Sequence, residues 1–133
     1  MRKHIHAIVG IACAAALVTG CASQPPTMSV SVGTHAGNAP ALYVSGTNFR
    51  TLSPIYVRLY DQSGRFGRTN MTFLLEEHDA DGAWSILRTI HHTIDPQDNV
   101  MQFTTYIDFA DRFKIVYIQN NQDIATTTFT VKA

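Results

Sequence analysis

The sequence predicts an all-β domain, a small antiparallel β-sandwich of about seven or eight strands. Short runs of alternating apolar and polar residues recur along the chain, and this period of two is typical of strands with one buried face. Clusters of Gly, Asn, Asp and Pro separate the runs, and no long helical pattern interrupts them. A small closed barrel would show the same periodicity and stays open as an alternative.

Three strands are expected in the first half of this domain. Residues 28–32 and 42–45 alternate apolar and polar side chains, and 55–60 is the clearest strand because both of its faces are consistent. Loops rich in Gly, Asn and Pro are expected between them, at 33–40 and 46–54.

The segment 67–74 is ambiguous between one short helix and a strand. A helical spacing relates Phe66, Thr69, Asn70, Phe73 and Leu74. A strand spacing relates Met71, Phe73 and Leu75. Periodicity alone leaves the two assignments equal.

The second half contains only strand patterns. A β-rich stretch covers 84–94 and ends before a Pro, and 101–109 is expected as one long strand with a continuous apolar face. Two further strands are expected at 113–118 and 125–131, joined by a turn of Asn, Gln and Asp.

The N-terminus has the pattern of a secretory signal. Arg2 and Lys3 precede an apolar run at 5–18 that is shorter than the roughly 20 residues of a membrane-spanning helix. The run ends in Val-Thr-Gly-Cys, which resembles a bacterial lipobox, so Cys21 is expected to be acylated. An ordinary signal peptide with an accidental cysteine is the alternative.

Three regions follow from this pattern. Residues 1–20 are expected as the signal peptide, 21–27 as a lipidated tether and 28–133 as the β-sandwich domain. Ala22 stands where an inner-membrane retention signal usually has Asp, which favours a periplasm-facing anchor in the outer membrane. Several acyl chains would hold the protein there almost permanently.

The composition gives no support for nucleic-acid binding or for a disulfide-stabilised fold. Lys plus Arg balance Asp plus Glu at ten each, and no basic cluster supports nucleic-acid binding. Cys13 would leave with the signal and Cys21 would be acylated, so no disulfide is expected.

No motif for catalysis or metal binding stands out, and neither an enzyme nor a cofactor is expected. His91 and His92 are consecutive strand residues, so their rings should point to opposite faces. Asp79, Asp81 and Gly82 resemble part of a calcium loop but lack its other acidic ligands, which favours a tight turn.

One strand carries a candidate binding face. Tyr56, Arg58 and Tyr60 share the polar side of 55–60, and Tyr and Arg are common at interaction hot spots. A cross-strand cluster with Arg58 lying over an aromatic ring explains the same pattern and is slightly favoured.

Several short motifs resemble a known family, the outer-membrane lipoprotein of the type VI secretion membrane complex (TssJ family). Asn48 and the stretch Ser53-Pro54-Ile55-Tyr56-Val57-Arg58-Leu59-Tyr60 carry the resemblance first. Phe66, Thr69, Asn70, Met71 and Leu74 follow the spacing of a second family motif, with Thr, Asn and Met in place of its usual Ala, Asp and Phe. Further matches are Ile86-Leu87, Ile94-Asp95-Pro96 and Phe113-Lys114-Ile115-Val116. The C-terminal Trp-Arg often seen in that family is missing.

The resemblance implies a non-enzymatic, transthyretin-like β-sandwich with one short helix near 67–74. It also implies that the lipoprotein anchors the periplasmic domain of an inner-membrane secretion subunit (TssM-type) to the outer membrane. The partner-binding loop, transferred by position, is formed by Asn48, Phe49, Arg50, Thr51, Leu52 and Ser53. Phe49 and Leu52 are either exposed contacts or residues that fold back to cap the sandwich.

A second resemblance is to bacterial immunoglobulin-like modules. Gly46-Thr47-Asn48-Phe49, Asp81-Gly82 and Thr128-Phe129-Thr130-Val131 carry it. It implies the alternative function, a free-standing ligand-binding or inhibitor envelope lipoprotein that uses the face of Tyr56, Arg58 and Tyr60.

Overall fold

The computed structural model describes residues 27–35 and 42–133. Cys21, the predicted signal peptide and most of the predicted tether lie outside these residues. In the described part the chain forms nine strands and no helix. The strands are β2 (Met28–His35), β3 (Tyr43–Ser45), β4 (Asn48–Arg50), β5 (Ile55–Asp61), β6 (Asn70–His78), β7 (Trp84–Thr93), β8 (Val100–Thr105), β9 (Asp111–Gln119) and β10 (Gln122–Lys132).

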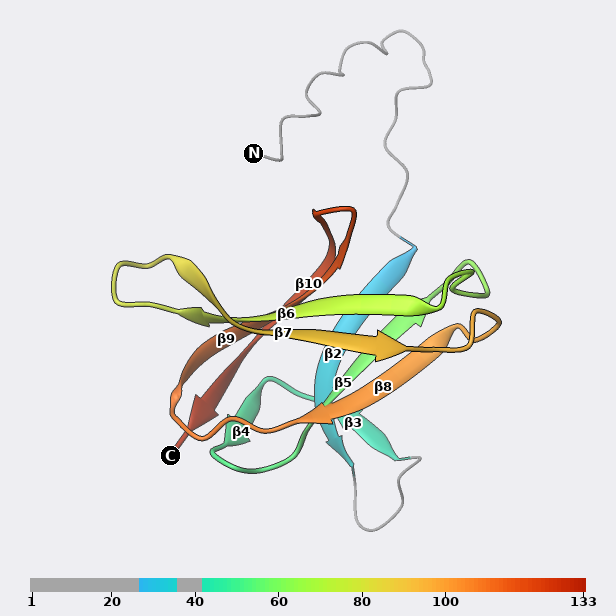
Figure 1. Ribbon diagram of the computed structural model, residues 1–133. Helices are drawn as coiled ribbons and strands as arrows, with labels where there is room; N and C mark the ends of the chain where they lie inside the picture. Colours follow the sequence, from blue (N-terminus) through green and yellow to red (C-terminus); the bar gives the residue numbers. More distant parts are fainter. Residues whose placement is uncertain (1–26, 36–41) are drawn as a thin grey trace, which may run out of the picture.

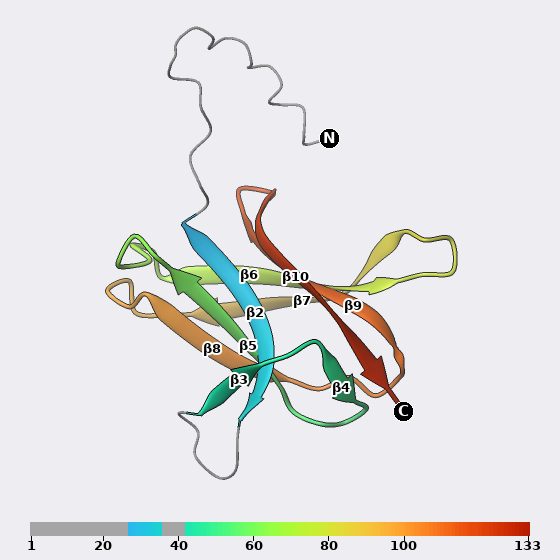
Figure 2. The same ribbon diagram turned by 180° about the vertical axis from the view of Figure 1, so that it is seen from behind.

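The strands form two sheets that pack face to face (Figures 1 and 2). One sheet has the order β4-β10-β9-β6-β7 and the other has the order β3-β2-β5-β8. All neighbouring pairs are antiparallel except β4 and β10, which run parallel with Asn48 opposite Thr130. The predicted all-β sandwich is therefore confirmed, with one strand more than expected.

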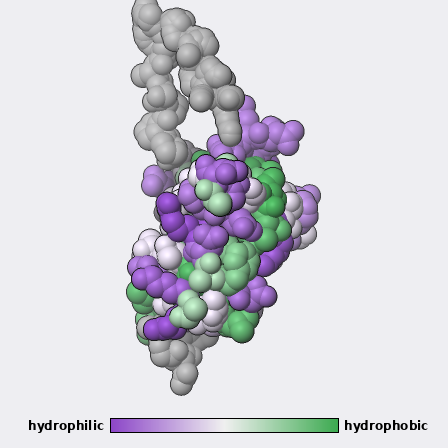
Figure 3. Space-filling model, turned by 90° about the vertical axis from the view of Figure 1, so that its left-hand side faces the viewer, coloured by the Kyte–Doolittle hydropathy of each residue, from purple (hydrophilic) through white to green (hydrophobic). Residues whose placement is uncertain are grey.

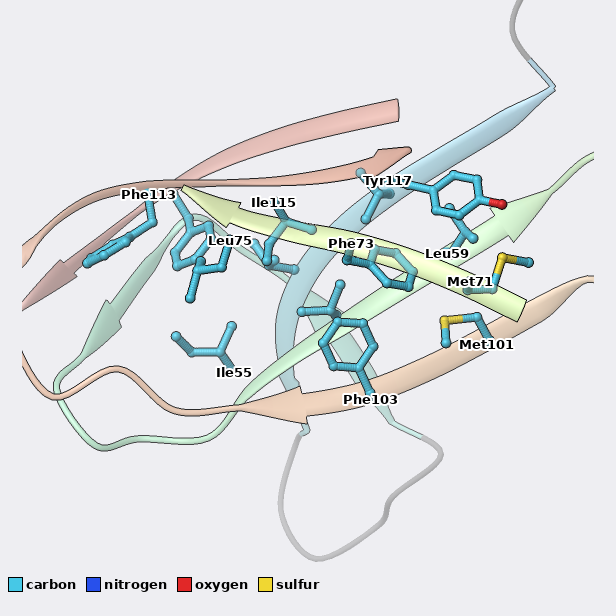
Figure 4. Close-up of a cluster of buried hydrophobic side chains, with 14 of the residues drawn as sticks. Ile55, Leu59, Met71, Phe73, Leu75, Met101, Phe103, Phe113, Ile115 and Tyr117 are labelled. Atoms are coloured by element: carbon cyan, nitrogen blue, oxygen red, sulfur yellow. The ribbon is translucent and has the colours of Figure 1, made fainter. Parts of the chain in front are cut away.

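The core lies between the two sheets, where alternate residues of each strand point inward (Figure 4). Phe73 of β6 lies at its centre, with its ring 5.0 Å from Phe103 and 5.3 Å from Tyr117 between centroids. Phe113 and Phe129 extend this aromatic packing toward the end where β4 lies, 5.7 Å apart. Burying each such side chain contributes about 1.5–3 kcal/mol, so the apolar core is the main source of stability.

The short helix implied for 67–74 is wrong. Most of this segment belongs to β6, whose inward residues Met71, Phe73 and Leu75 are at most 1% exposed. The strand is hydrogen-bonded on both sides, to β7 and to β9. Residues 72–77 pair with strands on both sides, so tertiary context overrides the apolar spacing that suggested a helix.

Several strand boundaries also differ from expectation, and three differences matter most. The strand β2 continues to His35 rather than ending at 32, because its last three residues pair with β3. The strand β8 ends at Thr105, so 101–109 is not one strand, although Ile107 still packs in the core. The expected loop at 46–54 contains β4, which depends on pairing with the distant β10.

The strand β2 begins at one end of the sandwich, and the short strands β3 and β4 lie at the other end (Figures 1 and 2). Met28 begins β2 at one end, where Gln62 donates to the carbonyl oxygen of Thr27 at 2.7 Å. Thr34 lies near the other end of the same strand, next to β3 and β4. Six residues of extended chain separate Met28 from Thr34, a distance of about 20 Å at 3.3 Å per residue. We call the second end the distal end. None of the described residues belongs to a helix that is long and apolar enough to span a membrane.

Candidate functional site

The segment 48–53 forms β4 and a tight turn at the distal end. Two backbone bonds anchor the turn to distant parts of the chain: the Thr51 amide donates to Lys132 at 2.9 Å, and the Leu52 amide donates to Ile107 at 2.8 Å. A third bond, from the Ser53 amide to the carbonyl oxygen of Arg50 at 3.2 Å, closes the turn on itself. The segment is therefore a fixed surface feature.

Phe49 is part of the core. It is 6% exposed and packs edge-to-face on Phe129, with ring centroids 5.6 Å apart. Of the two placements left open for Phe49, the structure shows the one inside the sandwich, because parallel pairing with β10 turns the middle residue of β4 inward. Of the two residues that were expected either to be exposed or to cap the sandwich, only Phe49 folds back.

Leu52 is exposed and has an unusual backbone conformation. Its side chain is 67% exposed, and its φ angle is +63°. Two other non-Gly residues among those described have positive φ, Asn120 and Asn121, and Asn is a residue type that tolerates this region. A branched leucine there costs about 1–2 kcal/mol. Exposed apolar surface and backbone strain thus coincide at one residue.

A shallow hollow of about 340 Å³ lies beside this turn. Its lining is formed by Thr34, Asn48, Phe49, Arg50, Ser53 and Lys132. Two cations and no carboxylate side chain line it, and Arg50 donates to the backbone oxygen of Ala133 at 3.0 Å. Exposed Val44 lies opposite Thr34 in the β2–β3 pair, so apolar surface continues along one wall.

The molecule exposes hydrophobic residues in several places. On the side that lies at the left in Figure 1, green hydrophobic surface is visible among purple hydrophilic areas (Figure 3). At the distal end the exposed large hydrophobic side chains are those of Leu42, Val44, Leu52 and Tyr106. Others lie elsewhere, for example Ile86 and Leu87 on the edge strand β7.

The candidate face of Tyr56, Arg58 and Tyr60 is on the outside of the four-stranded sheet. The Arg58 guanidinium carbon lies 4.1 Å from the centroid of the Tyr43 ring, and Nε and Nη2 both donate to Gln102 Oε1, at 3.1 and 3.0 Å. Tyr60 is exposed at the end of this face. The cross-strand cluster is therefore present, and the ring under Arg58 comes from β3.

Two further contacts order this face. The ring of His35 stacks on Tyr56, with centroids 3.7 Å apart and an interplanar angle of 15°. The hydroxyls of Ser31 and Tyr43 are 2.7 Å apart. Burial raises the pKa of the Tyr43 phenol, and the hydrogen bond to Ser31 and the charge of Arg58 offset this only in part. The phenol therefore stays neutral in ordinary buffers.

The other candidate groups have structural contacts. Nδ1 of His91 lies 3.1 Å from the hydroxyl of Thr72, while the His92 ring packs at a tilt against core residue Phe103, so the two rings lie on opposite faces. Oδ1 of Asp79 accepts from the amides of Asp81 and Ala83, at 3.0 Å each, which closes a tight turn. In residues 27–35 and 42–133, no group of three or more His, Cys, Asp or Glu is placed to hold a metal ion.

Sequence reasoning missed several members of these sites. Thr34 and Lys132 reach the hollow only through the pairing of β2 with β3 and of β4 with β10. Tyr43 had a usable signal, because its alternation with Leu42 and Val44 places it on the polar side of its strand. Gln102 pairs with Arg58 across β5 and β8, which only the strand order reveals.

Comparison with known proteins bears on the fold. No family model and no curated protein matches the chain. Among solved structures, an immunoglobulin-like protein from Pseudomonas aeruginosa is 12% identical, with a TM-score of 0.52, over 83% of this chain and 94% of that one. A superoxide reductase from Ignicoccus hospitalis is 11% identical, with a TM-score of 0.44, over 80% of each chain. The first likeness supports an immunoglobulin-like sandwich.

Proposed function

We propose that this protein is a lipid-anchored adaptor of the bacterial envelope. Acylated Cys21 would hold it at the outer membrane, facing the periplasm, and the distal end would bind the periplasmic domain of an inner-membrane subunit. The resemblance to the TssJ family suggests a TssM-type subunit of a type VI-like secretion complex as that partner. The role requires binding at two ends and no catalysis.

The positions of the membrane anchor and of the hollow, at opposite ends of the domain, support this proposal. The chain enters the sandwich at Met28, seven positions after Cys21, so at most about 25 Å of chain separates the lipid from the fold. The hollow and the turn at Leu52 lie at the distal end, so the length of β2 separates them from the point where the chain enters the sandwich. A membrane-bound partner reaching from the other side would meet this end first.

Leu52 is the observation that carries the proposal. An exposed leucine at positive φ lowers stability without filling any core position, so a contact outside this domain is the simplest use for it. The hollow next to it contains Arg50 and Lys132. A partner segment with one apolar side chain for Leu52 and one carboxylate for the two cations fits this surface.

The size of the surface is adequate for an anchored protein. A hollow of this volume supports only a modest interface when both proteins are free in solution. Two proteins confined to facing membranes bind at a raised effective concentration, so a modest interface suffices.

Co-purification of the full chain with the periplasmic domain of the TssM-type subunit tests the proposal. Leu52→Asp should reduce capture at least about tenfold, and Arg50→Ala should add to the loss. Leu87→Asp is the matched control, because Leu87 is also an exposed leucine but lies on β7. Equal loss in both leucine variants would remove the site assignment, and no capture by the unchanged chain would refute the function.

Cys21→Ser tests the anchor separately. The variant should bind the partner domain in solution with unchanged affinity, since Cys21 precedes the first strand of the sandwich by seven positions, but should lose activity in cells by leaving the membrane fraction. Full activity of a released domain would contradict the anchor half of the proposal.

A further inference from the structure

The outer face of the four-stranded sheet carries an ordered polar cluster that the adaptor role does not use. Its six members are Ser31, His35, Tyr43, Tyr56, Arg58 and Gln102, and they come from all four strands of the sheet. We call them the outer-face cluster. Because hydrogen-bonded neighbours fix each strand, the spacing between these side chains is set by the sheet itself.

Arg58 is held in place by neutral partners. Its guanidinium lies over the Tyr43 ring at 4.1 Å and donates twice to a single oxygen, Oε1 of Gln102. The Gln102 amide nitrogen in turn donates to Nε2 of His35 at 2.9 Å, and the His35 ring stacks on Tyr56. Each link orients the next, so the guanidinium is fixed before any ligand arrives.

Gly33 makes this arrangement possible. A Cβ at this position would overlap the carbonyl oxygen of Val44 and would lie 2.9 Å from Cε1 of the Tyr43 ring. Only glycine lets β3 and the Tyr43 ring approach β2 so closely. The ring can then lie beneath Arg58.

The charge of Arg58 has no carboxylate partner in the part of the chain that the structure describes. The strands β2, β3, β5 and β8 contain a single acidic residue, Asp61, which is buried and accepts from the amide and hydroxyl of Ser63. After the two bonds to Gln102, three of the five guanidinium N–H groups, including both on Nη1, have no acceptor among the described residues. A planar, fixed and uncompensated guanidinium is suited to a carboxylate.

We propose that the outer-face cluster binds an acidic, extended peptide segment of a protein partner. A Glu or Asp carboxylate of that segment accepts from the free edge of Arg58, and its neighbouring side chains lie on the His35–Tyr56 stack. The composition favours a peptide, because Tyr and Arg are the residue types enriched at protein-binding hot spots. This surface is separate from the hollow at the distal end, so the proposal stands or falls independently of the adaptor role.

A titration of the full chain in detergent micelles with a short peptide of alternating Glu and Thr tests the proposal. The readouts are the NMR signal of the Arg58 Nε–H group and the anisotropy of the labelled peptide. We expect the Arg58 signal to shift and the affinity to fall at least about tenfold in Arg58→Gln, because a charge-assisted bidentate contact is lost. Arg58→Lys should bind with intermediate affinity, since it keeps the charge but not the fork.

Arg65→Gln is the matched control. Arg65 is exposed and also donates to a glutamine, Gln97 at 3.2 Å, but its guanidinium lies over no aromatic ring of the described residues. It should leave peptide binding unchanged, and thermal unfolding of each variant shows whether the fold is intact. The same peptide with Gln in place of Glu should bind at least about tenfold more weakly.

Four results would overturn the proposal: no binding of the Glu peptide, equal binding of the Gln peptide, equal loss in Arg58→Gln and Arg65→Gln, or saturation of the Arg58 shift by free acetate at the same affinity as the peptide. The last would indicate a small-anion site. A fifth result would also overturn it: self-association of the chain that is lost in Arg58→Gln would mean that a second copy, and not a partner segment, covers this face.

Discussion

The amide of Leu52 donates a 2.8 Å hydrogen bond to the carbonyl oxygen of Ile107, a residue whose side chain is 2% exposed. The bond joins a strained, exposed turn to a residue of the core. The leucine side chain is thus presented to solvent from a backbone that cannot easily relax. Its cost in stability can therefore be measured separately from the partner binding that we propose for it.

Replacing Leu52 by Asn should therefore stabilise the protein. Asn tolerates positive φ, so we expect the free energy of unfolding to rise by about 1 kcal/mol, measured by urea denaturation. Capture of the proposed partner should fall at the same time. The reverse change, Asn121→Leu at φ +62°, should lower stability by a similar amount without affecting capture.

Phe49→Ala should act on the fold. Removing a buried ring that packs on Phe129 should lower the free energy of unfolding by about 3–5 kcal/mol. Leu52→Ala, which removes an exposed side chain from the same segment, should change it by no more than about 0.5 kcal/mol. Stability of Phe49→Ala equal to that of the unchanged chain would contradict the placement of β4.

Gly33→Ala should disturb the contact between β2 and β3. The added Cβ would meet the Val44 carbonyl oxygen and Cα of Ser45, the latter at 2.9 Å, and should cost about 1–3 kcal/mol by overpacking. The Tyr43 ring current shifts the NMR signals of the Arg58 protons that lie over the ring. Loss of these shifts in Gly33→Ala would report that the two side chains no longer stack. Gly46→Ala is the control: nothing lies within 4 Å of a Cβ at that site, so its stability should stay within about 0.5 kcal/mol.

Asp79 should make stability depend on pH at the acid end. Hydrogen bonds from the Ala83 amide and from Ser85 hold its pKa below the usual value of 3.8. A lowered folded-state pKa stabilises the fold above pH 3.8, and this contribution is lost as the pH falls through the folded-state pKa. NMR titration of the carboxyl carbon should give a midpoint below 3.8, and Ser85→Ala should move that midpoint upward. A midpoint at or above 3.8 in the unchanged chain would refute the turn geometry.

The sequence predicted those elements whose evidence is local. The strand β5 follows directly from the alternation of Ile55, Val57 and Leu59 with polar residues, because both faces agree over its length. Segment 67–74 could not be assigned in the same way, since Leu74 fits a helical spacing as well as it fits the outer face of β6. What decides the matter is pairing with β7 and β9, which no local pattern contains.

The candidate sites likewise contain residues that a local pattern identifies and residues that only distant strand pairing brings together. Arg58 was identified from its own strand, while its ring partner Tyr43 lies beyond β2, which separates β3 from β5 in the sheet. Phe49 looked like a loop residue because β4 is only three residues long and pairs with residues near the end of the chain. Short strands that depend on distant partners carry almost no periodic signal of their own.

The parallel pairing of β4 with β10 also sets the order of events during folding. Arg50 and Ala133, whose atoms meet at the distal end, are 83 positions apart. The turn at Leu52 is held through Lys132, so it acquires its shape only after the last strand of the domain has been synthesised and docked. An unfinished or C-terminally clipped chain would lack this surface, so the partner binding that we propose for the distal end would require a completed β10.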